Sequence, residues 1–157
     1  MSTSKCIIVL RGHIRNSFET PALRNMMLRI INKNSNASIC IHTWSTFANS
    51  ISWRSVRENT TLVTIEIIRE YFGEEIFRRC DRIIIDDDSL NKLHGRTKGT
   101  VLARGNMPII GWKNYWCGKH RILQAITQMS NADGWDPVRI ITCRFDVLNN
   151  SNSLTET

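Results

Sequence analysis

Four short apolar runs, each rich in β-branched residues, constrain the fold of this 157-residue chain more than any other feature. The runs cover residues 5–10, 38–44, 82–88 and 139–148. Because each run is apolar at nearly every position rather than at alternate positions, we expect strands that are buried on both faces, as in a parallel sheet.

Segments with helical periodicity separate these runs. Apolar residues at spacings of three and four predict helices over 19–32, 64–72 and 112–129. Gly73 is expected to stop the second helix, with a further turn over 75–79. The polar stretches predict a long loop over 45–57, with room for a short helix, and a surface excursion over 89–108.

Strands that alternate with helices imply parallel pairing through right-handed crossovers. We therefore expect an α/β fold, a three-layer sandwich with a mostly parallel central sheet. It would form one domain over residues 1–148, followed by a polar tail over 149–157. The chain contains neither G-x-G-x-x-G nor G-x-x-x-x-G-K-[ST], so dinucleotide and P-loop chemistry have no support.

Composition narrows the class of protein. Hydrophobic residues make up 41% of the chain, yet no apolar run approaches the roughly 20 residues that cross a bilayer. The apolar start at 6–10 is too short for a secretion signal, so we expect a cytoplasmic protein. Five cysteines without C-x-x-C spacing predict reduced thiols. The net charge of +7 favours anionic partners, but the basic residues are scattered, so nucleic acid is not the expected one.

Charged residues follow the first and last strands. Arg11, Gly12 and Arg15 come directly after the first, where two guanidinium groups and an open backbone could grip a phosphate. The alternative is a solvated loop. Arg144 and Asp146 lie two residues apart in the last run, so both are expected on one face of a strand. Arg144 could bind an anion while Asp146 binds a cation or a hydroxyl group. Alternatively, the two could form a buried ion pair.

Three further segments could contribute to a site. His42 and Trp44 end the second strand, where they could frame a base or a sugar, or belong to the core. The carboxylates of 86–88 could share Mg²⁺ or Mn²⁺, or form a turn. At the start of the last helix, Lys113 could line a cleft with Trp112, while Trp116 is expected to pack inward; the helix N-terminus favours an anion.

These segments together resemble a glycosyltransferase family of the GT-A type, encoded in large DNA virus genomes and in bacterial capsule or lipopolysaccharide loci. The resemblance rests on the order of 8–15, 41–44, 112–125 and 136–148, and it spans nearly all of residues 5–148. It implies a nucleotide-binding, Rossmann-like half in which the loop after the first strand meets the nucleotide. The acceptor would be a glycan or glycoprotein.

In such enzymes a D-x-D at a later strand end binds a metal together with the sugar diphosphate. Arg144-Phe145-Asp146 would take that place, which leaves Asp146 for Mn²⁺, Mg²⁺ or the sugar, and Arg144 to neutralise the diphosphate. The family continues into an acceptor-binding half, whereas this sequence ends soon after Leu148. We therefore expect a donor-binding half, a truncated member or a degenerate relative, and we assign no catalytic base.

The leading hypothesis is thus a nucleotide-sugar-binding domain of a glycosyltransferase for surface or capsid glycans. Its donor site would contain Arg11, Gly12, Arg15, His42, Trp44, Lys113, Arg144 and Asp146. One rival is a basic, non-enzymatic α/β module that binds nucleic acid or protein. Another is a magnesium-dependent, phosphatase-like hydrolase that uses the carboxylates of 86–88.

Overall fold

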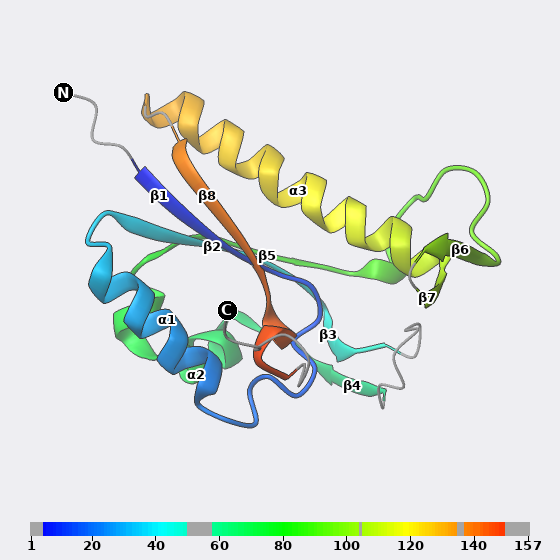
Figure 1. Cartoon of the computed structure of the whole chain (residues 1–157), viewed down its shortest axis with the longest axis horizontal. Helices are drawn as coiled ribbons and strands as arrows, with labels where there is room; N and C mark the ends of the chain where they lie inside the picture. Colours follow the sequence, from blue (N-terminus) through cyan, green and yellow to red (C-terminus); the bar gives the residue numbers. More distant parts are fainter. Residues whose placement is uncertain (1–4, 50–57, 104, 135–136, 150–157) are drawn as a thin grey trace.

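The centre of the protein is a four-stranded parallel sheet flanked by helices, as seen in a computed structural model that describes residues 5–49, 58–103, 105–134 and 137–149 (Figure 1). The strand order is β5-β2-β1-β8. The strands of this sheet are β1 (Lys5–Arg11), β2 (Ala37–Trp44), β5 (Cys80–Asp86) and β8 (Pro137–Arg144). The helices are α1 (Ala22–Lys33), α2 (Ile65–Phe77) and α3 (Ile109–Asp133). Within the described residues, no helix combines the length and apolar character needed to cross a lipid bilayer.

Side chains of the central strands alternate between two hydrophobic clusters. Ile8 and Leu10 of β1 belong to a cluster that includes the apolar faces of α1 and α2. Ile7 and Val9 belong to a second cluster with Ile122 and other residues of α3. Successive strand residues point to opposite faces, so α1 and α2 cover one face of the sheet and α3 the other, as Figure 1 shows. Burial on both sides therefore explains the apolar runs of β1 and β2. β8 lies at the edge of the sheet, where Ile140 and Ile141 are 40% and 39% exposed, so the prediction that its run is buried on both faces is wrong.

The order of the strands determines where a ligand can approach. From β1 the chain adds β2 and β5 on one side and then returns, through α3, to place β8 on the other side of β1. The order thus changes direction between β1 and β8. In open α/β sheets, ligands bind outside the carboxyl ends of the strands at such a point. The carboxyl ends of β1 and β8 meet there, because Arg11 pairs with Arg144 in the parallel register.

All three predicted helices are present in the structure, but some of their first and last residues differ from the prediction. Thr64 caps α2 by accepting a hydrogen bond from the backbone N–H of Ile67. Gly73 interrupts α2 with a φ of 74°, and one further turn follows it, as expected. The helix α3 begins at Ile109, earlier than its predicted start at residue 112.

Two predicted irregular segments contain strands instead. The expected loop 45–57 includes β3 (Thr46–Ala48), which pairs antiparallel with β4 (Asn59–Leu62); residues 50–57 lie outside the described residues. The expected excursion 89–108 ends in an antiparallel pair, β6 (Thr100–Ala103) and β7 (Gly105–Pro108), after a single 3-10 turn at Asp88–Leu90. Local polarity hid these short pairs, because their strands are held by each other and not by burial in the main sheet.

The strand predicted over 139–148 is too long. β8 ends at Arg144, and Phe145–Asn149 forms a 3-10 turn. Its partner β1 ends at Arg11, which pairs with Arg144, so the ladder between β1 and β8 stops there. Phe145 turns into the core with 1% of its surface exposed. Arg144 and Asp146 are therefore neighbours across a turn, not along a strand. Of the expected tail, 150–157 lie outside the described residues.

Candidate functional site

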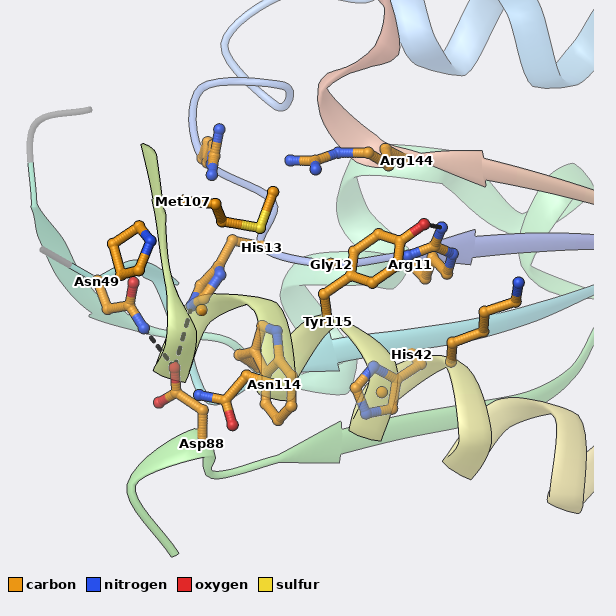
Figure 2. A pocket seen from close by; sticks show the side chains of 16 residues that line it. Arg11, Gly12, His13, His42, Asn49, Asp88, Met107, Asn114, Tyr115 and Arg144 are labelled. Carbon is orange, nitrogen blue, oxygen red and sulfur yellow. Dashed lines mark hydrogen bonds and ion pairs between the residues drawn. The ribbon is translucent and has the colours of Figure 1, made fainter. Parts of the chain in front are cut away.

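A pocket opens at the carboxyl ends of β1, β2 and β8, against the first turns of α3 (Figure 2). Its volume is about 90 Å³, and one side is open to solvent. Among the described residues that line the pocket, four are cationic and one is a carboxylate. The cations are Arg11, Arg15, Lys119 and Arg144, and the carboxylate is Asp88. A hollow lined mainly by one sign of charge concentrates ions of the opposite sign, so the pocket favours an anion.

Arg11, the last residue of β1, is buried in the pocket wall with 9% of its surface exposed. Its Nη2 donates to the hydroxyl of Tyr115 at 2.6 Å, and its guanidinium carbon lies 4.2 Å from the centre of the Tyr115 ring. Its Nε, in contrast, is buried without a hydrogen-bond partner. A buried donor of a charged group that has no hydrogen-bond partner costs free energy.

Arg15 and Arg144 are held beside the pocket by the same carboxylate. Asp146 accepts from Arg144 Nε at 2.7 Å, from Arg144 Nη2 at 2.9 Å and from Arg15 Nη1 at 2.9 Å. The side chain of Asp146 is only 4% exposed and is not part of the pocket wall. It therefore acts as a clamp that fixes two guanidinium groups at the pocket.

The backbone between these arginines is unusual. Arg15 has a φ of 57°, the left-handed region that costs a non-glycine residue energy, and its N–H donates to the carbonyl of Phe47 at 2.7 Å. Gly12 has a φ of 97°, and a Cβ there would meet nothing within 4 Å, so its conformation and not a lack of space requires glycine. Its N–H donates to the carbonyl of His42 at 3.1 Å. The loop after β1 is thus held in a defined shape at the pocket.

His42 lines the pocket but is a satisfied core residue, 1% exposed, that donates from Nε2 to Asp86 at 3.1 Å. Burial lowers its pKa despite that hydrogen bond. Burial alone would raise the pKa of Asp86, but hydrogen bonds from Arg121 and His42 lower it. Gly118 of α3 packs on the ring, and a Cβ there would lie 2.7 Å from His42 Cε1. This glycine lets α3 approach β2 closely beside the pocket.

Of the remaining residues predicted for the site, Trp44 lines the pocket and Lys113 does not. Trp44 packs edge-on against His42, with ring centres 4.9 Å apart. The ammonium group of Lys113 donates to the carbonyl of His94. Trp116 is 45% exposed, so its predicted inward packing is wrong. Asn114 and Gly118 occupy the inward face of α3, and Trp116 lies between them in sequence on the other side.

Sequence reasoning did not select several residues that line the pocket. Tyr115 and Lys119 lie near the start of α3, and the sequence analysis gave them no role. The spacing Gly111, Tyr115, Gly118 is the signal that could have found them, since residues three and four apart share a helix face. Asn49 and Met107 come from segments predicted as irregular, and no local pattern marked them.

The three carboxylates of 86–88 do not converge. Asp86 binds His42 and Arg121, Asp87 accepts from the backbone and hydroxyl of Ser89, and Asp88 accepts from the amide of Asn49. Among the residues that the structure describes, no group of three or more His, Cys, Asp or Glu side chains is placed to hold a metal ion. These carboxylates end a strand and begin a turn, which was the alternative to a metal site.

Comparison of the chain with known protein families, with curated proteins and with solved structures found no match.

Proposed function

We propose that this pocket binds the diphosphate of a nucleotide-sugar and that the protein is the donor-binding part of a glycosyltransferase. One observation carries the proposal: three arginines from two neighbouring strand ends line one pocket, and the buried Nε of one of them lacks a partner. The nucleotide-binding, three-layer architecture of the GT-A or Rossmann-like type is part of the same proposal.

The arrangement suits a phosphorylated ligand for a physical reason. Guanidinium groups bind phosphate oxygens through paired, charge-assisted hydrogen bonds, and Arg11, Arg15 and Arg144 converge from the two sides of the β1–β8 boundary. The first turn of α3 borders the same pocket and adds the partial positive charge of a helix N-terminus. Together these groups would stabilise the charge that develops on a departing nucleotide diphosphate.

A divalent cation fits the observed residues poorly. Asp146, the carboxylate predicted to bind Mn²⁺ or Mg²⁺, is 3% exposed and already accepts hydrogen bonds from two guanidinium groups, whose charge opposes a cation. Arg144 stands where the resemblance puts the other carboxylate of a D-x-D. We therefore propose no step that requires a metal and expect the arginines to neutralise the diphosphate. Binding of a metal at Asp146 stays a prediction, which the titration with and without Mn²⁺ tests.

Isothermal titration against UDP-, GDP- and CMP-sugars, each with and without Mn²⁺, tests the proposal. Arg144→Ala should weaken binding by about 10- to 100-fold, the loss expected for one charge-assisted contact. Arg139→Ala is the matched control, because Arg139 is an exposed arginine of the same strand outside the pocket.

Three outcomes would contradict the proposal. The first is that no nucleotide-sugar binds in any combination. The second is that both arginine variants weaken binding equally. The third is binding of random oligonucleotides that falls steeply with salt and is insensitive to Arg144→Ala, which would indicate a basic module that binds nucleic acid.

A further inference from the structure

Two titratable side chains face each other across the pocket, and the proposed donor site does not use either of them. His13, in the loop after β1, and Asp88, at the start of the turn after β5, both line the pocket (Figure 2). His13 Nε2 lies 3.7 Å from Asp88 Oδ2, and their side chains are 13% and 14% exposed. The pair is therefore largely shielded from solvent.

The distance between these atoms leaves both partly unsatisfied. A gap of 3.7 Å is too long for a direct hydrogen bond, and His13 Nε2 has no hydrogen-bond partner. Asp88 accepts from the amide of Asn49, and burial raises its pKa. His13 Nε2 is fully buried, so the imidazole must turn slightly to expose it; an oxygen atom beside the pair, off the line that joins them, could then lie about 2.8 Å from both. The pair thus offers a site for a hydroxyl group.

Burial and the neighbouring positive charges together keep His13 neutral. Burial, followed by the positive charges of Arg15 and Arg144, lowers the pKa of its imidazole from 6.5 to about 4. Asp146 opposes this effect, and His42 adds to it slightly. A neutral imidazole with an unpartnered nitrogen can accept a proton. The two arginines that lower its basicity are two of the three that line the proposed diphosphate site.

We propose that His13, with Asp88 opposite it, is the proton-accepting group of this pocket and takes the proton of the acceptor hydroxyl. This inference rests on the proposed function and adds the base that sequence reasoning could not assign. The hydroxyl oxygen bonds to the anomeric carbon of the donor, and the bond from that carbon to the diphosphate breaks. The electron pair stays on the diphosphate, and the hydroxyl proton goes to the imidazole of His13.

Binding of the anion would itself adjust the base. A diphosphate on Arg15 and Arg144 offsets their positive charge, which removes the main electrostatic opposition to a proton on His13. The pKa of His13 should then rise towards the working pH, where a general base is most effective. Asp88, 3.7 Å away, would stabilise the imidazolium once it forms. The site would gain an effective base only when its donor is in place.

NMR of the wild-type protein tests this coupling without knowledge of the acceptor. Long-range proton–nitrogen spectra report the titration of each imidazole ring, with sulfate as the probe anion because sulfate does not itself titrate near neutral pH. The His13→Gln variant assigns the resonance. Without sulfate, His13 should titrate at about 4. Saturating sulfate should raise that midpoint by about one unit or more.

The outcomes separate this inference from the proposed function. Sulfate that shifts the arginine side-chain resonances but leaves the His13 midpoint unchanged overturns the inference and spares the anion site. No sulfate binding at the arginines overturns both.

A kinetic measurement tests the proton transfer itself, with release of sugar from the bound donor to water as the readout. His13→Gln should lower kcat by about 100-fold or more without raising KM, and should remove the fall in rate at acid pH. His120→Gln, the same substitution at an exposed site of α3, should match the wild type. A His13→Gln protein with an unchanged kcat overturns the inference, as does a wild type that binds donor but never cleaves it.

Discussion

Replacement of Asp146 by asparagine should destabilise the protein and weaken the anion site together. Its carboxylate is 4% exposed and accepts from two nitrogens of Arg144 and one of Arg15. Asparagine keeps one carbonyl oxygen but replaces the other acceptor with an NH₂ group that faces guanidinium donors. The variant therefore loses acceptors while two positive charges remain close to each other.

The magnitude follows from the environment of each partner. A hydrogen bond to a charged group contributes about 1.5–3 kcal/mol, and removal of one member of a buried ion pair costs about 3–5 kcal/mol. Arg144 is 36% exposed, so water can solvate its guanidinium again and reduce the loss. We expect Asp146→Asn to lower the free energy of unfolding by about 3 kcal/mol, or the melting temperature by roughly 6–12 °C for a chain of this size.

Urea unfolding followed by circular dichroism gives the free energy, provided that the slope of the transition stays the same. Asp81→Asn is the control, because Asp81 pairs with Lys5 at 2.5 Å at an exposed position and should cost less than about 1 kcal/mol. Affinity for the anionic ligand should also fall in Asp146→Asn, since two arginines lose their clamp. A loss of stability no greater than that of Asp81→Asn would refute the clamp.

Three other perturbations test the fold and its electrostatics. Gly118→Ala would place a methyl group 2.7 Å from a ring atom of buried His42, so differential scanning calorimetry should show a loss of about 1–3 kcal/mol, and a stabilised variant would contradict the close packing. Thr64→Ala removes the cap on the N–H of Ile67 and should cost about 1 kcal/mol in the same assay; no change would mean that the cap contributes nothing. The pKa of His13 is about 4 when folded and 6.5 in the unfolded chain, so the unfolded state binds the additional proton, and stability should fall as the pH drops from 6.5 to 4. Urea titrations across this range should show a shallower fall in His13→Gln, and equal slopes would contradict the burial of a neutral imidazole.

The core of the sheet could be predicted because its signal is local. Runs such as Ile7–Leu10 are apolar at every position, and only a strand covered on both faces buries all of them. The α/β class and the central parallel sheet flanked by helices were confirmed on this basis. The prediction failed at β8, whose end at Arg144 depends on where its partner β1 stops. The length of a strand is a property of the pair and not of one segment.

Part of the candidate site could be predicted for the same reason. Arg11, Arg15 and Arg144 were selected because charged residues directly after apolar runs must emerge at strand ends, and the structure brings all three to one pocket. The pairing of His13 with Asp88 was hidden, since 75 residues separate them and neither segment contains a sign of the other. The clamp role of Asp146 was hidden as well, because it depends on a turn that begins where β1 ends.

The sequence by itself determined which segments become the strands of the central sheet and the three helices, and which cations lie at the strand ends, since periodicity and burial act over a few neighbouring residues. The tertiary structure alone decided which side chains share the pocket and which carboxylate binds which guanidinium. It also decided that His13 stays neutral, because burial and the fields of Arg15 and Arg144 act through space between groups brought together by the strand order.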